Sequence, residues 1–141
     1  IEINGSRVFD SVQATWNMLE QSAGPALQAA SDAGLGVIIK ESVANGRLTR
    51  NNENPQFADK MARLQTMANQ HGTTVDALAM VAVIAQPFVD ITLSGAAIVP
   101  HLESNLKALD VEWQFDLPEL LADMREPADE YWGTRSQLAW N

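Results

Sequence analysis

Ser94 and Gly95 directly follow the β-rich run Val89–Leu93. A helix with Pro100 in its first turn is predicted shortly after these two residues. A strand that leads through a glycine turn into a helix N-terminus presents free backbone N–H groups and the positive end of the helix dipole at one place. The position of Ser94 and Gly95 therefore predicts a phosphate-binding loop. The alternative is a tight strand-to-helix turn that binds no ligand.

Three short strands are predicted at residues 8–14, 36–40 and 89–93, because these runs are apolar and rich in β-branched residues. The second run is apolar almost throughout, as in a strand that is buried on both faces. A helix between the first two strands begins at Gly24-Pro25 and ends at Gly34, since proline suits the first helical turn and glycine the left-handed end. This order of elements is typical of a βαβ unit.

Further helices are predicted from apolar residues at helical spacing and from capping residues. They cover residues 56–70, 75–85, 99–109, 117–125 and 128–138. Strands that alternate with helices predict a single α/β domain over residues 1–141 with a parallel sheet. A parallel sheet needs cover on both faces, and three strands leave two unpaired edges. We therefore expect a partner, a further part of the fold, or self-association.

Charge and composition exclude several classes of function. The 141 residues carry a formal net charge of −9, and the nine Lys and Arg residues are scattered rather than gathered in a stripe, which argues against nucleic-acid binding. The chain has no cysteine, so disulfides, thiolate metal sites and a cysteine nucleophile are excluded. The apolar run Ala77–Ala85 is too short to span a membrane, and residues 1–5 lack the features of a signal peptide. We expect a cytoplasmic protein with no membrane partner.

Several stretches of the sequence resemble the aldo-keto reductase family. They are residues 9–17 (FDSVQATWN), 36–41 (GVIIKE), 44–49 (ANGRLT) and 93–105 (LSGAAIVPHLESN), and the ending 131–141 (YWGTRSQLAWN) is similar to one bacterial branch. The order and the spacing of these stretches are together more specific than any one of them. The resemblance implies a partial (β/α)8 TIM barrel that comprises strands six to eight, their helices and a helical tail.

The resemblance also implies an NADP(H) site at the carboxyl ends of the strands, where barrel enzymes hold phosphate groups. It places the carboxamide of Gln13 against the nicotinamide. The segment after the second strand, which includes Lys40, Glu41 and Gly46, would lie along the nicotinamide and the pyrophosphate. The adenosine and the 2′-phosphate would be held by residues of the segment after the third strand: Ser94, Gly95, His101, Ser104 and Asn105.

Four positions depart from the family's pattern. Lys40 stands where an aromatic residue often stacks on the nicotinamide, and Glu41 where a small hydroxyl group is usual. A carboxylate at that place repels phosphate. His101 stands where many members have Arg or Gln, and Ser104 where they have Glu or Gln. The contacts with the cofactor are therefore expected to differ, and the choice between NADH and NADPH stays open.

The family's catalytic residues, an Asp, a Tyr, a Lys and a His, belong to the first half of the barrel, which has no counterpart in these 141 residues. The single tyrosine, Tyr131, matches no catalytic motif. No catalytic residue is therefore assigned, and the chain is expected to bind the cofactor weakly and to be inactive alone. Family substrates are carbonyl groups of sugars, steroids or small aldehydes. The alternative is a stand-alone, self-associating α/β protein whose cofactor surface is repurposed or vestigial.

The candidate residues also have purely structural interpretations. Gln13 would bond a neighbouring backbone group within a buried strand, and Lys40 and Glu41 would form a charge pair at the strand end. Asn105 would be an ordinary polar helix residue, and His101 a solvated one, since no metal-ligand spacing surrounds it. The acidic residues of the tail predict a solvated face: Glu119, Asp123, Glu126, Asp129 and Glu130.

Overall fold

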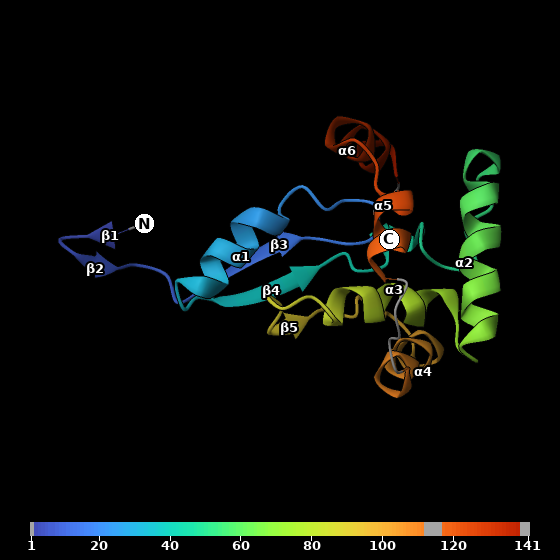
Figure 1. Cartoon of the computed structure of the whole chain (residues 1–141), viewed down its shortest axis with the longest axis horizontal. Coiled ribbons are helices and arrows are strands. Elements are labelled where there is room, and N and C mark those ends of the chain that lie inside the picture. The colour runs from blue at the N-terminus through green and yellow to red at the C-terminus, as the bar shows by residue number, and fades with distance from the viewer. Residues whose placement is uncertain (1, 112–116, 139–141) are drawn as a thin grey trace.

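A parallel three-stranded sheet forms the centre of the computed structural model, which describes residues 2–111 and 117–138. The strands are β3 (Ser11–Thr15), β4 (Gly36–Lys40) and β5 (Ile91–Thr92), in the order β3-β4-β5 (Figure 1). The register places Gln13 opposite Ile38, and Ile38 opposite Ile91. The predicted α/β class and parallel sheet are confirmed, and β4 has the predicted bounds.

Helices follow the strands as predicted. The described α-helices are α1 (Gly24–Asp32), α2 (Ala58–Gln70), α3 (Val75–Ile84), α4 (Val99–Leu106), α5 (Leu117–Met124) and α6 (Ala128–Gln137). Short 3-10 turns lie at Ala44–Gly46, Pro55–Phe57 and Lys107–Asp110. Local sequence explains several bounds: the Thr74 hydroxyl caps α3 by accepting a hydrogen bond from the Ala77 N–H at 3.3 Å, and Gly34 follows α1 with a φ of +77°.

Two predicted strands are shorter in the structure. The strand predicted at 8–14 begins at Ser11, and the one predicted at 89–93 is a regular strand over two residues. In the second case the Asp90 side chain takes the place of a strand carbonyl, since its Oδ2 accepts a hydrogen bond from the Val37 N–H at 2.7 Å. A side-chain acceptor at this point competes with the regular ladder and delays its start.

An antiparallel hairpin that the sequence analysis misses precedes the sheet. Its strands are β1 (Glu2–Ile3) and β2 (Ser6–Arg7), and Figure 1 shows it at one end of the molecule, away from the helices of the tail. Asn4 and Gly5 form the turn with positive φ angles of 53° and 76°. This dipeptide is the strongest short-range signal for such a turn, but two-residue strands give no alternation that would support it.

The two faces of the sheet have different surroundings. On one face, side chains of β3 and β4 pack against α1 and α3 in an apolar cluster of Trp16, Leu27, Val37, Ile39, Val83 and Phe88. The opposite face carries Gln13, Ile38, Lys40 and Ile91, and none of these belongs to a buried apolar cluster of the described chain. Gln13, Lys40 and Ile91 are exposed, and we call this side the open face.

A second core lies beyond the carboxyl ends of β3 and β4. It joins the loops after these strands to α2, α3 and the tail helices, with buried residues that include Met18, Leu48, Phe57, Leu64, Leu78, Leu120, Met124 and Tyr131. The tail, defined here as the described residues 117–138, therefore packs on the loops at which a barrel enzyme has its active site.

Candidate functional site

Three loops meet at one edge of the sheet because the strands are parallel. They begin after Thr15, Lys40 and Thr92, the last residues of β3, β4 and β5. Ligands of open α/β sheets and of barrels bind at this edge. The candidate site is therefore built from these loops and from the open face beside them.

The loop after β5 is held by Asn105 of α4. The Asn105 side chain is buried, and its Nδ2 donates to the Ser94 carbonyl oxygen at 3.1 Å. The Ser94 hydroxyl accepts a hydrogen bond from the Ala96 N–H at 3.1 Å, and Gly95 adopts a φ of +65° that glycine tolerates best. Asn105 is thus a support for the Ser94 loop rather than an ordinary polar residue of a helix surface.

This loop leaves several backbone donors without a partner. The N–H groups of Gly95, Ala97 and Val99 donate no hydrogen bond within residues 2–111 and 117–138. No side chain of the described ranges caps α4, and Pro100 follows its first residue. A glycine turn with uncommitted N–H groups at a helix N-terminus has the donors that an anion needs.

Ser104 and His101, the two other predicted site residues on α4, have different surroundings. The Ser104 hydroxyl lies 3.1 Å from the Thr74 hydroxyl at the start of α3, so it joins two helices. His101 is exposed in the first turn of α4. The structure therefore brings Ser94, Gly95 and Asn105 together, while Ser104 is engaged with α3.

Gln13 and Lys40 lie on the open face. Both are exposed, and the Gln13 carboxamide makes no hydrogen bond within the part of the chain that the structure describes, so the interpretation as a partner of neighbouring backbone has no support. Thr15 lies opposite Lys40 in the register, and its hydroxyl is buried without a partner among the described residues. The Gln13 carboxamide and the Thr15 hydroxyl of β3 therefore have no hydrogen-bond partner among the described residues.

Glu41 does not pair with Lys40 but with Arg135 of α6. The Arg135 guanidinium donates three hydrogen bonds of 2.9–3.2 Å to the Glu41 carboxylate, and these bonds raise the pKa of Arg135. Gly46, further along the same loop, is exposed with a φ of +90°. The negative charge of Glu41 is therefore compensated inside the protein.

A polar network that no sequence pattern indicates joins this loop to the tail. The Asn17 Nδ2 donates to the Tyr131 hydroxyl and to the Glu41 carbonyl, both at 3.0 Å. Burial raises the pKa of Tyr131 to about 12, with a further contribution from the nearby Glu41 carboxylate. Tyr131 therefore joins α6 to the loop after β3 through a buried hydrogen bond.

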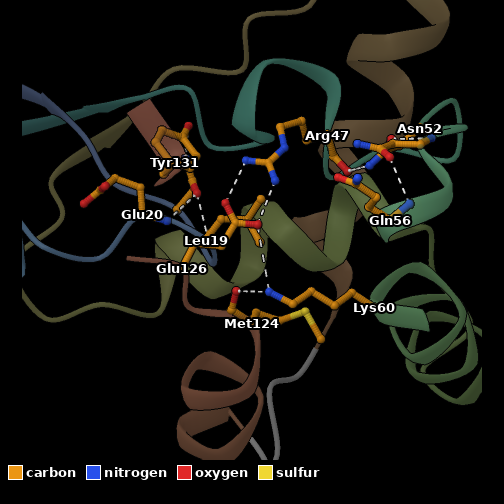
Figure 2. Close-up of polar contacts among 11 residues, drawn as sticks. Leu19, Glu20, Arg47, Asn52, Gln56, Lys60, Met124, Glu126 and Tyr131 are labelled. Carbon is orange, nitrogen blue, oxygen red and sulfur yellow. Dashed lines mark hydrogen bonds and ion pairs between the residues drawn. The ribbon is translucent and has the colours of Figure 1, made fainter. Parts of the chain in front are cut away.

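The prediction of a solvated acidic face is wrong for Glu126. Its carboxylate accepts two hydrogen bonds from Arg47, at 2.7 and 2.9 Å, and Lys60 approaches it to 3.9 Å (Figure 2). Asp123 also forms an ion pair, with Arg63, but this pair is exposed. The partners of Glu126 lie more than sixty residues away in the chain, so no local pattern identifies them.

The sequence model of the aldo/keto reductase family matches residues 4–118. This chain belongs to the aldo/keto reductase family. A thermostable aldo-keto reductase, solved in complex with the inhibitor epalrestat, has a similar structure with a TM-score of 0.64 and 20% sequence identity. The similarity covers 79% of this chain and 38% of that reductase, so the fold is part of a TIM barrel. No curated protein matches the sequence.

The residues at the strand ends of this aldo/keto reductase chain fit part of a nicotinamide dinucleotide. The uncommitted N–H groups at Gly95 and Ala97 suit a phosphate, and the exposed carboxamide of Gln13 suits an amide-bearing ring. Elsewhere in the described chain, a groove of about 440 Å³ lies between α2 and α5, away from the strand ends. The described residues contain no cluster of three metal-ligating side chains and no helix with the length and apolarity of a membrane span.

Proposed function

We propose that this chain forms part of the NADP(H) site of an aldo-keto reductase that reduces carbonyl groups. The observation that carries the proposal is the loop between β5 and α4, where the N–H groups of Gly95, Ala97 and Val99 have no partner among the residues that the structure describes. Asn105 holds this loop in place from a buried position. Aldo/keto reductase membership supports a nicotinamide cofactor at this edge of the sheet.

The proposed roles follow from the surroundings of each residue. The loop at Ser94 and Gly95 binds a phosphate of the cofactor, and Asn105 fixes the loop. Gln13 and Lys40 lie on the open face, where Gln13 holds the nicotinamide carboxamide and Lys40 offers a positive charge. NADPH would supply the hydride when it is bound. His101 and Ser104, which are exposed and bonded to Thr74 respectively, contribute less than the Ser94 loop.

The proton donor of carbonyl reduction comes from residues outside these 141. Tyr131 is the single tyrosine of the sequence, it is fully buried, and burial raises its pKa to about 12. A general acid needs a pKa near the working pH and access to the substrate. We therefore expect no carbonyl reduction by the 141 residues alone.

The open face and the sheet edges support a larger assembly. Ile91 and Leu93 are 51% and 41% exposed on or beside β5. Further exposed apolar side chains are Ile98 at the N-cap of α4 and Leu102 and Leu106 within this helix. Parallel sheets are normally covered on both faces. In the proposed enzyme this surface packs against the preceding strand–helix units of the barrel, on the same polypeptide or on another.

A calorimetric titration of the 141-residue chain with NADPH at low salt tests the proposal. Saturable binding is expected, and Gln13→Ala and Asn105→Ala should each weaken it about tenfold, the ratio that corresponds to one lost hydrogen bond. Gln65→Ala, an exposed glutamine on α2, is the matched control. Absence of binding in the wild-type chain would contradict the proposal. A parallel titration with NADH decides the cofactor preference.

Sedimentation distinguishes the proposed assembly from the alternative. A chain that forms a compact dimer and binds no NADPH would favour a self-associating α/β protein with a repurposed surface. A chain that becomes monodisperse only with the preceding units of an aldo-keto reductase barrel supports the proposal.

A further inference from the structure

The loop after β4, residues 41–47, has an unusual backbone, and we call it the β4 loop. Glu41, Ala44 and Asn45 have positive φ angles of 58°, 49° and 54°, and Gly46 follows with 90°. Left-handed backbone is unfavourable for residues with a Cβ and persists where the surroundings hold it. Contacts from outside the β4 loop are therefore needed to hold this backbone.

Ion pairs to the tail hold the β4 loop at both ends. At the first end, Glu41 receives three hydrogen bonds from Arg135. At the other end, Arg47 donates two to Glu126, as Figure 2 shows. The side chains in both pairs are 9–16% exposed. The loop thus contributes one negative and one positive end, and the tail supplies the opposite charge to each.

Two further contacts strengthen this arrangement. The Asn17 Nδ2, which also bonds Tyr131 of α6, donates to the Glu41 carbonyl and so fixes the first peptide of the loop. The Arg47 guanidinium lies 5.6 Å from the ring centres of both Phe57 and Tyr131. Such cation–π contacts add to an ion pair that is shielded from water.

We infer that Arg135 and Glu126 are positioning residues for the β4 loop, and that Arg135 turns the Glu41 carboxylate away from an anionic ligand at the strand ends. The family match ends at residue 118, so both residues lie outside it. The part of this inference that concerns the ligand rests on the proposed NADP(H) site. The part that concerns loop order does not.

Hydrogen exchange tests the loop order directly. Arg135→Met should speed exchange of the β4-loop amides about tenfold or more, while amides of the buried helix α3 keep their rates, because the loop opens locally when its support is lost. Arg135→Lys, which keeps the charge, should restore part of the protection. Glu126→Gln tests the other end of the loop, and serves also if Arg135→Met does not fold. Unchanged loop exchange in both variants would overturn the inference.

The exposed ion pair between Arg63 and Asp123 provides a matched control. Its side chains are 61% and 37% exposed, and it joins α2 to α5 without touching the β4 loop. Arg63→Met should leave exchange of the β4 loop unchanged. A rise in exchange throughout α3 in Arg135→Met would instead indicate general destabilisation and contradict a positioning role.

NADPH titration tests the role of the charge. Arg135→Met should weaken binding about tenfold or more by leaving the Glu41 charge uncompensated, and the double variant with Glu41→Gln should recover most of the loss. A double variant as weak as the single one would show that charge compensation plays no part. If the wild-type chain binds no NADPH, the proposed function fails together with this charge role, and the exchange data alone decide whether the tail positions the loop.

Discussion

The two faces of the sheet differ in exposure: one is buried beneath helices and the other carries exposed side chains. Ile39 and Ile38 are neighbours on β4, yet Ile39 is fully buried beneath α1 and α3 while Ile38 lies on the open face. One face provides the apolar burial that stabilises the chain. The other carries the exposed groups Gln13 and Lys40. The residues that stabilise the chain and the strand residues proposed to bind the cofactor therefore lie on opposite faces of the sheet.

The largest expected effect comes from truncation on the covered face. Ile39→Ala should lower the free energy of unfolding by about 2–5 kcal/mol, because it removes buried methyl groups and leaves a cavity. Ile38→Ala, the matched variant on the open face, should cost under about 1 kcal/mol. Urea unfolding monitored by circular dichroism measures both. Equal losses would mean that the open face is covered in solution, and the comparison would fail.

A smaller loss of stability is expected when the buried hydrogen bond between Asn17 and Tyr131, beyond the carboxyl ends of the strands, is removed. Tyr131→Phe removes the acceptor of the Asn17 amide and should lower the free energy of unfolding by roughly 1–3 kcal/mol, since a buried donor is left unpaired. Trp132→Phe is the control: its ring packs edge-on against Tyr131 at 5.3 Å, so this variant changes the ring contact without removing the hydroxyl, and it should cost less. A neutral Tyr131→Phe variant would show that the network does not stabilise the tail.

The same tyrosine gives a pH test of its burial. Tyrosinate absorbance of the folded chain should appear around pH 12, whereas in the unfolded chain it should appear near the ordinary value of 10.0. Because the folded state keeps the proton to a higher pH, this contribution to stability is complete below pH 10 and is lost as pH rises toward 12. The chain has one tyrosine, so the signal has one source. If tyrosinate absorbance of the folded chain appeared near pH 10.0 instead, Tyr131 would be exposed to solvent and the prediction would be wrong.

The smallest effect on stability is expected on the open face itself. Ile91→Lys should change the free energy of unfolding by about 0.5 kcal/mol or less, because the side chain is 51% exposed. It should nevertheless reduce self-association, since a charge replaces apolar surface. Ile84→Lys, at an exposed isoleucine on α3, is the control. Light scattering of concentrated samples measures the difference, and equal association of all three chains would argue against the open face as a contact surface.

Local sequence predicts most of the elements of this fold. The bounds of β4 follow from one apolar run, and those of α1 and α3 from Pro25, Gly34 and Thr74, whose backbone and side-chain preferences act within a few residues. The strand predicted at 89–93 is shorter in the structure, because the Asp90 carboxylate accepts a hydrogen bond from the neighbouring strand β4. The β-propensity of residues 89–93 gives no information about this contact with another strand.

The candidate site is predicted less completely than the fold. Ser94, Gly95 and Asn105 lie together because a turn and the following helix place them, while their role toward a cofactor stays a prediction. The partner of Glu41 was not predictable, since Arg135 is 94 residues further along the chain. A pairing across that distance depends on the packed tertiary structure and leaves no periodic signal in the sequence.

These long separations have a consequence for the order of folding. Contacts between distant residues close large loops and form slowly. During synthesis, residues up to Ile84 leave the ribosome before Glu126 and Arg135 do, so the left-handed residues near Ala44 lack the support of these two side chains during that time. The β4 loop is therefore among the last segments to become ordered. The proposed binding edge therefore takes its shape only after α6 has been synthesised and has packed on the loop.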